Sequence, residues 1–168
     1  PKCEVRGYSV GHFLSACALM YASTGDEVLK AKADRVVAGL AECQAKMGSG
    51  YLSAFPEEFI DRVEVGKRVW APWYTIHKIY AGLVDMAVLC GNRQALEVVT
   101  KACDWVKSRC DKLSDEQMEK MLGNEHGGMN DVLAEVYALT GEEKYLKLAQ
   151  RFNHHAVLDP LSRREDCL

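Results

Sequence analysis

Three segments of this chain repeat one pattern, and the repeat limits the fold more than any other feature of the sequence. Each segment passes from the apolar end of a helix through a glycine, an acidic or amide residue, a few polar residues and a leucine to small or apolar residues at helical spacing. The segments are residues 19–34, 88–104 and 137–151. Self-similarity of this kind is typical of stacked helical hairpins, so the sequence predicts an all-α protein built from repeated antiparallel helix pairs.

The residues at each joint explain why one helix ends and the next begins. A helix that closes its last carbonyl groups through a left-handed residue favours glycine, which adopts that conformation without steric cost. The three joints place a glycine there: Gly25, Gly91 and Gly141. Asp26 and Asn92 can then cap the following helices, whereas Glu142 is a weaker cap that still suits the positive end of a helix. Because the joints are short, the paired helices are expected to run antiparallel.

Apolar residues recur at helical spacing on both sides of the joints. Between Leu29 and Leu40 they form one stripe of a helix, and similar stripes follow later in the chain. The pattern predicts a single domain over residues 1–168 with six main helices, at residues 9–24, 26–46, 72–90, 93–111, 129–140 and 142–153. Two long connections remain, 47–70 and 111–128, the second with a short helix near 114–121. Long connections between regular hairpins often carry binding or catalytic residues.

The composition is that of an ordinary globular domain and excludes two classes of partner. With 48% hydrophobic and 27% charged residues, a chain of 168 residues can bury one core. The formal net charge of -3 creates no field that would attract a phosphate backbone or an anionic lipid surface. No apolar stretch approaches the roughly 20 residues that cross a bilayer. Neither nucleic acid nor a membrane is therefore expected as a partner.

Neither the N-terminus nor the cysteines indicate a compartment. Residues 1–7 carry charges and no apolar segment, so they predict no signal peptide, and a start at Pro1 without methionine favours truncation or processing. The seven cysteines form no C-x-x-C pair and no zinc-site spacing, and their odd number argues against a complete disulfide framework. No metal site is predicted. Four cysteines lie in apolar helical patterns and are expected to be buried free thiols: Cys17, Cys43, Cys90 and Cys103.

The first long connection ends in a group of aromatic residues. Trp70, Trp73 and Tyr74 cluster at the start of a predicted helix, and Pro72 suits its first turn. Aromatic side chains at the mouth of a loop suit the apolar faces of sugar rings, and His77, one turn on, could hydrogen-bond to hydroxyl groups. The alternative is a hydrophobic staple that locks the loop onto the core. From the chemistry alone, the structural role is favoured over a ligand-binding one.

The second long connection ends in the string GNEHGGMND. It brings Glu125, His126 and Asn130 together just before a helix, next to two glycines that allow close approach of the backbone. An acid, an imidazole and an amide in this position are typical of the polar floor of a pocket. The alternative is a glycine turn capped by Asn130, with His126 on the surface. The residues alone do not decide between the two.

Other polar residues have weaker functional signals. His12 is expected to pack in the core, and His154 and His155, which follow the last apolar stripe, are expected on the surface. One loop contains a group of carboxylates, Glu57, Glu58 and Asp61. Neighbouring acids need not face one another, so this group is weak evidence for the paired carboxylates of a glycosidase.

Several ordered strings of the sequence resemble one enzyme family. They are GHFLSACALMYASTGD, GYLSAFPEEF, VWAPWYTIHKIYAGLVD, EHGGMND and VLAEVYALTGEEKYLKLAQRF. From Tyr8 to Asp159 the chain is similar to the N-terminal part of the catalytic toroid of glycoside hydrolase family 127 (GH127), the β-L-arabinofuranosidase-like proteins. The resemblance implies an (α/α)6 barrel, of which the six predicted helices would form about half.

The resemblance also implies a glycoside hydrolase activity, the removal of L-arabinofuranose units from glycans. In the family a zinc-bound cysteine is the nucleophile and a glutamate is the general acid/base; zinc lowers the pKa of the thiol that attacks. These residues belong to the later half of the barrel, expected beyond Leu168, and none of the seven cysteines here matches the ligand positions. No catalytic residue and no zinc ligand is therefore assigned within this chain.

By resemblance, His126 falls where a family histidine faces the sugar. Four more residues fall at or near pocket-lining positions: Trp70, Tyr74, His77 and Asn130. A carbohydrate is thus the expected partner. The alternative is a helical-repeat module that binds a protein without catalysis, but such a module would spread its anchors over one outer face rather than cluster them. Half a toroid also leaves apolar helix faces uncovered, through which the chain is expected to self-associate.

Overall fold

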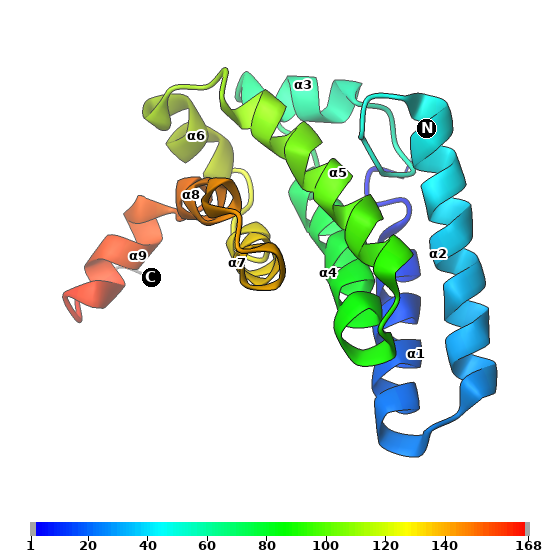
Figure 1. Cartoon of the computed structure of the whole chain (residues 1–168). Helices are drawn as coiled ribbons and strands as arrows, with labels where there is room; N and C mark the ends of the chain where they lie inside the picture. Colours follow the sequence, from blue (N-terminus) through cyan, green and yellow to red (C-terminus); the bar gives the residue numbers. More distant parts are fainter. Residues whose placement is uncertain (1–2, 167–168) are drawn as a thin grey trace.

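The computed structural model describes residues 3–166, and within that range the chain forms nine α-helices and no strand (Figure 1). They are α1 (Tyr8–Thr24), α2 (Glu27–Met47), α3 (Glu58–Glu64), α4 (Pro72–Cys90), α5 (Arg93–Cys110), α6 (Asp115–Leu122), α7 (Met129–Thr140), α8 (Glu143–Arg151) and α9 (His155–Ser162). The all-α class and the six expected main helices are confirmed, and α6 is the short helix of the second connection. The sequence does not predict the two other short helices, α3 and α9, which have seven and eight residues.

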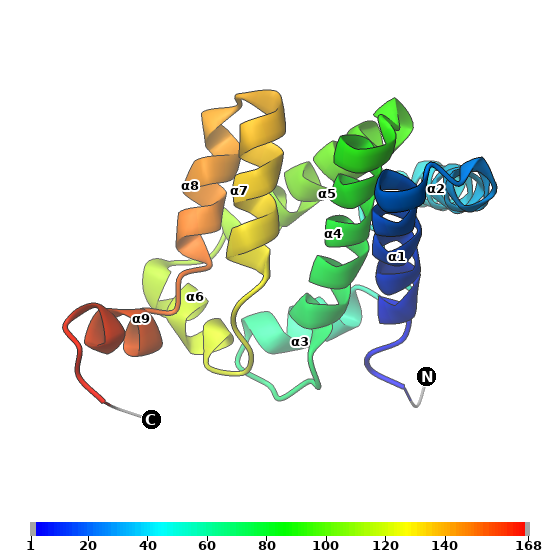
Figure 2. The same ribbon diagram turned by 90° about the horizontal axis from the view of Figure 1, so that it is seen from below.

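The three expected hairpins stand side by side in two layers. Helices α1, α4 and α7 form one layer, in which α4 contacts both neighbours, and α2, α5 and α8 form the other, in which α5 contacts both neighbours. Figure 2 shows the hairpins extending from an end of the molecule where α3, α6 and α9 lie. In the toroid that the family resemblance implies, two layers of this kind would be the inner and outer helices, and we call the layer of α1, α4 and α7 the inner one.

The glycine joints have the predicted conformation. Gly25, Gly91 and Gly141 end their helices with φ of 70°, 64° and 72°. Asp26 and Asn92 accept hydrogen bonds from backbone N–H groups of the helices that follow them, whereas Glu142 makes no side-chain cap. The local chemistry of the repeat therefore accounts for where each hairpin turns.

Helices α1 and α4 approach so closely that their backbones touch. Their contact is the most extensive between any two elements. A Cβ atom added at Gly11 would lie 1.8 Å from the carbonyl oxygen of Lys78, and one at Gly82 would lie 2.5 Å from the carbonyl oxygen of Gly11. Tyr8 contacts Tyr74 nearer the start of both helices, so the two run parallel and begin at the same end of the molecule.

The core runs through all three hairpins and is centred on α4. The inward face of α4 is fully or almost fully buried, and its members include Ile76, Ile79, Tyr80, Leu83 and Val84. This is the apolar stripe that the sequence predicts for this helix. Within residues 3–166, no helix combines the length and the hydropathy that a membrane crossing requires.

Three of the four cysteines expected in the core are buried free thiols: Cys17, Cys90 and Cys103. The prediction for Cys43 is wrong, since this residue is exposed. The next residue, Gln44, faces the core instead, and its amide donates to the carbonyl oxygens of Gly50 and Val98 at 2.9 and 3.0 Å. A polar side chain occupies this inward position because its amide is hydrogen-bonded.

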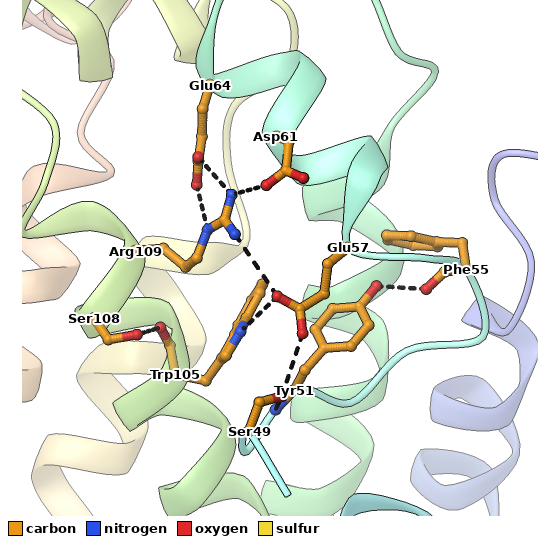
Figure 3. Close-up of polar contacts among 9 residues, drawn as sticks. All are labelled: Ser49, Tyr51, Phe55, Glu57, Asp61, Glu64, Trp105, Ser108 and Arg109. Carbon is orange, nitrogen blue, oxygen red and sulfur yellow. Dashed lines mark hydrogen bonds and ion pairs between the residues drawn. The ribbon is translucent and has the colours of Figure 1, made fainter. Parts of the chain in front are cut away.

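Helix α3 is held onto α5 by one arginine (Figure 3). The guanidinium of Arg109 binds Glu64 at 2.6 Å, contacts Asp61 and lies 3.7 Å from Glu57. The indole N–H of Trp105 donates to Glu57 at 3.3 Å. Two of the loop carboxylates considered above as glycosidase candidates therefore face Arg109, which gives them a structural role.

Candidate functional site

The inner helices α1, α4 and α7 all begin at the end of the molecule where the two long connections lie (Figure 2). This end, which we call the inner-helix end, comprises residues 8–12, 69–78 and 124–131. All five predicted site residues belong to it: Trp70, Tyr74, His77, His126 and Asn130. Residues far apart in the sequence meet here because the inner helices are parallel.

The aromatic group at the start of α4 divides into a core residue and two exposed ones. Trp73 is 2% exposed, its indole N–H donates to the sulfur of Met121 at 3.2 Å, and its ring meets Phe152 edge-on. Trp70 is 67% exposed and Tyr74 is also exposed. The structural role is therefore right for Trp73, while the rings of Trp70 and Tyr74 are accessible to a ligand.

Helix α1 adds residues to this end that the sequence does not identify as part of a site. The prediction that His12 packs in the core is wrong: His12 is exposed, and its Nε2 lies 3.5 Å from the hydroxyl of Tyr74. Tyr8 meets His12 edge-on, and the ammonium of Lys78 lies 5.3 Å from the centre of the Tyr74 ring. The only sequence signal for this cluster is the shared spacing of four residues within each pair, 8 and 12 on α1 and 74 and 78 on α4.

His77 packs against the glycine turn before α7. A Cβ atom on Gly128 would lie 2.5 Å from Nδ1 of His77, so this imidazole contacts the backbone of the turn. The pKa of His77 is lowered to about 4, mainly by burial and also by the nearby charge of Lys78, while Asp131 opposes the shift. The ring is therefore neutral at pH 7, with one nitrogen that donates and one that accepts a hydrogen bond.

His126 is exposed and has a second histidine beside it. The ring centroids of His126 and His154 are 4.8 Å apart. The expectation that His154 lies on the surface is wrong, because its side chain is only 11% exposed and its Nδ1 lies 2.7 Å from Glu119, in an arrangement without hydrogen-bond alignment. Glu119 also accepts hydrogen bonds from the first backbone N–H groups of α9, which brings this segment back onto α6. His155 is exposed, as expected.

Asn130 does not cap α7, as the structural alternative supposed. The helix follows Gly128 with no side-chain cap. The amide of Asn130 instead donates to the side-chain oxygen of Asn153 at 3.2 Å. Asn130 therefore links the start of α7 to the segment between α8 and α9, and it is half-buried.

Glu125 joins the two long connections. Its carboxylate accepts hydrogen bonds from the backbone N–H groups of Trp73, at 2.5 Å, and Tyr74, at 3.3 Å. Burial raises the pKa of Glu125 to about 7, although both hydrogen bonds favour the charged form. The sequence places Glu125 in the second connection but does not reveal that its partner is the start of α4.

The opposite pKa shifts of Glu125 and His77 predict a pH signature for the inner-helix end. The pKa of Glu125 rises from 4.5 to about 7 on folding, so its contribution to the free energy of unfolding falls as pH rises through this window. The pKa of His77 falls from 6.5 to about 4, so its contribution rises with pH between these values. For each group, the free energy of unfolding changes by at most about 1.4 kcal/mol per pH unit. The change is smaller for His77, because this residue is half-buried and solvent screens its charge.

Glu125→Gln removes the contribution of Glu125 to the free energy of unfolding, which falls as pH rises, and leaves that of His77 in place. Relative to the unmodified protein, the free energy of unfolding of this variant is therefore expected to increase between pH 5 and pH 7, by about 1 kcal/mol per pH unit. His77→Gln is the matched variant and is expected to show a change of opposite sign below pH 6.5. Urea unfolding at pH 5, 6 and 7 measures both. A difference from the unmodified protein that does not vary with pH would contradict the shift assigned to that residue.

Comparison with known proteins places this geometry in a family. The model for the GH127 catalytic domain of β-L-arabinofuranosidases matches residues 1–168. The chain belongs to this family. Among solved structures, the GH127 β-L-arabinofuranosidase Ara127N-Se from Geobacillus stearothermophilus T6 superposes on the chain with a TM-score of 0.71 and 21% identity, over 98% of this chain and 26% of that chain. No curated protein matches the sequence.

The structural match to the GH127 enzyme shows a shared all-α toroid fold, which confirms the resemblance stated above. The chain spans about a quarter of the length of that solved relative. The two layers of α1, α4, α7 and α2, α5, α8 are thus a consecutive part of a GH127 toroid.

The described residues 3–166 offer no site for the zinc-bound cysteine that the GH127 resemblance implies. Among residues 3–166, no three histidine, cysteine, aspartate or glutamate side chains form a group that could hold a metal ion. Burial raises the pKa of the Cys103 thiol and raises that of Cys110 to about 12, so both stay protonated at neutral pH. These residues do not fit a zinc–thiolate nucleophile.

Proposed function

We propose that this part of the GH127 domain supplies sugar-binding surface to an enzyme that acts on L-arabinofuranose-containing glycans. The observation that carries the proposal is the inner-helix end itself, where parallel inner helices gather exposed aromatic rings, a neutral imidazole and an exposed histidine. Such a mixture of apolar faces and hydrogen-bonding groups suits a sugar ring, which has both. The family match supports the class of substrate.

The five site residues have distinct proposed roles. Trp70 and Tyr74 offer exposed aromatic faces against which a sugar ring can pack. His77, neutral at pH 7, offers one donor and one acceptor to hydroxyl groups. His126 is the proposed principal contact to the sugar. Asn130, whose amide is bonded to Asn153, is proposed to line the pocket next to His126.

The reaction of the complete protein is likewise a proposal. By family membership it is the hydrolysis of β-L-arabinofuranosides, and no residue of this chain is assigned to bond cleavage. The proposed contribution of residues 8–131 is to bind and orient the sugar, which raises the rate by holding the scissile bond in a reactive geometry.

A protein-binding module without catalysis is the second candidate, and two observations favour it. A cavity of about 760 Å³ lies between α2 and α5 on the outer layer, lined by small residues of α2 and polar residues of α5. The apolar stripe on the exposed face of α1, which includes Phe13 and Met20, also suits a protein surface, and we propose self-association through it. Neither feature involves the aromatic and histidine cluster, so the sugar site is the better-supported function.

The test of the sugar site is His126→Ala in the complete protein. Because His126 is exposed and outside the core, the variant is expected to melt within about 2 °C of the unmodified protein. Loss of a sugar hydrogen bond is expected to weaken L-arabinose binding about tenfold. Calorimetric titration measures the affinity.

His155→Ala is the matched control, since this histidine is also exposed but lies on α9 and outside the inner-helix end. It is expected to bind L-arabinose as the unmodified protein does. Equal affinity in the unmodified protein and the His126→Ala variant would remove His126 from the site and overturn the proposal. No detectable binding of L-arabinosides by the unmodified protein would favour the protein-binding module.

A further inference from the structure

Helix α4, which carries Tyr74 and His77, begins without a cap of its own. Its first flanking residue is Ala71, which has no side-chain acceptor and adopts the left-handed conformation with φ 49°. Pro72 follows at the first helical position. A helix start leaves backbone N–H groups without intrahelical partners, and a non-glycine residue at positive φ is strained. Something outside the helix must therefore hold this start in place.

The second connection supplies the missing acceptor. The carboxylate of Glu125 binds the N–H groups of Trp73 and Tyr74, the second and third helical positions, where a side chain at the flanking residue would bind in an ordinary cap. Next to it, the amide of Asn124 donates to the carbonyl oxygen of Val69 at 2.8 Å. Two consecutive residues of one connection thus hold the last residues of the other and the first turn of α4.

We propose that Glu125 is a positioning residue of the sugar site, which holds the His126 turn and the exposed face of α4 in one fixed arrangement. The inference rests on the proposed function of that site. Glu125 is joined directly to His126, so its bonds to α4 determine where His126 lies relative to Tyr74. The contact between His77 and Gly128 joins α4 to the same turn at a second place.

Glu125 suits this role electrostatically and sterically. When Glu125 is ionised, above its pKa of about 7, its charge lies at the positive end of a helix of 19 residues. The carboxyl is largely buried, and only backbone N–H groups oppose the rise of its pKa to about 7, so no charged side chain compensates it. Glu125 makes its bonds to the backbone, which leaves sugar recognition to the neighbouring exposed side chains.

The experiment is a double-mutant cycle in the complete protein with Glu125→Ala and His126→Ala, measured as L-arabinose affinity by calorimetric titration. Because a displaced His126 would lose its hydrogen bond to the sugar, Glu125→Ala is expected to weaken binding about tenfold. In the His126→Ala background, Glu125→Ala is expected to add less than about threefold, since the residue that Glu125 positions is already gone. Glu125→Gln keeps one acceptor oxygen and is expected to retain most of the affinity.

The outcomes separate failure of this inference from failure of the proposed function. If His126→Ala weakens binding and Glu125→Ala does not, the positioning role is wrong and the sugar site stands. If the two losses multiply fully in the double variant, Glu125 acts independently of His126 and the inference is also overturned. If His126→Ala leaves binding unchanged, the proposed function itself fails. Should Glu125→Ala not fold, the same cycle with Glu125→Gln decides, with a smaller non-additive loss expected.

Discussion

Gly11→Ala is expected to destabilise the protein by at least about 3 kcal/mol. The added Cβ would lie 1.8 Å from the carbonyl oxygen of Lys78 and 2.7 Å from the backbone nitrogen of Ile79. These atoms belong to the backbone of α4 and cannot rotate away, so α1 and α4 must separate along the most extensive contact in the fold. The denaturant midpoint in urea unfolding, followed by circular dichroism at 222 nm, measures the loss.

Gly39→Ala is the matched control for this substitution. Gly39 also lies inside a helix, α2, but a Cβ atom there would meet nothing within 4 Å. Because alanine is the better helix former, this variant is expected to be more stable by about 0.5–1 kcal/mol. If Gly11→Ala behaved like Gly39→Ala, the close approach of α1 and α4 would be wrong.

Arg109→Ala is expected to cost about 3 kcal/mol, because it removes the cation that three carboxylates share. Arg109 is 16% exposed and its partner Glu64 is 12% exposed, so the remaining charge would be poorly solvated. The side chain also lies 5.8 Å from the centre of the Trp105 ring, and that packing would be lost as well. Thermal unfolding at pH 7 is the measurement, and α3 is expected to detach first.

Arg109→Lys tests whether the guanidinium geometry is needed. An ammonium keeps the charge but cannot bridge Glu64 and Asp61 with a planar set of donors, so this variant is expected to recover less than half of the loss. Arg35→Ala is the surface control; Arg35 is exposed on α2, and its removal is expected to change stability by less than about 0.5 kcal/mol. Equal effects of Arg109→Ala and Arg35→Ala would contradict the network in Figure 3.

The hairpins are predictable from the sequence because their signals are local. A glycine followed by a capping residue ends one helix and starts the next within a few residues, as at Gly25 and Gly91. The bounds of α4 and α7 agree with those predicted from the apolar stripes and the flanking glycines. Long ordered strings of the sequence, such as VWAPWYTIHKIYAGLVD and EHGGMND, carry the family resemblance, and through it the sequence also indicates the toroid class.

The candidate site is only partly predictable. The connections that carry Trp70 and His126 are recognisable as long polar or aromatic segments between hairpins. The residues that contact these connections are not recognisable, because each contact joins residues that are far apart in the chain. Glu125 and Trp73 are 52 residues apart. His154 lies beside His126 only because α9 returns onto α6. No local pattern reports such pairs.

By itself the sequence determined the six main helices, their glycine joints and the family, since backbone propensity, capping and apolar spacing act within one or two helical turns. The tertiary structure alone decided which residues meet. Gly11 illustrates the reason: in the sequence it is an unfavourable residue inside a helix, at a cost of about 1 kcal/mol relative to alanine. Only the tertiary structure shows why a glycine is needed at this position: the carbonyl oxygen of Lys78 occupies the space where a side chain would be.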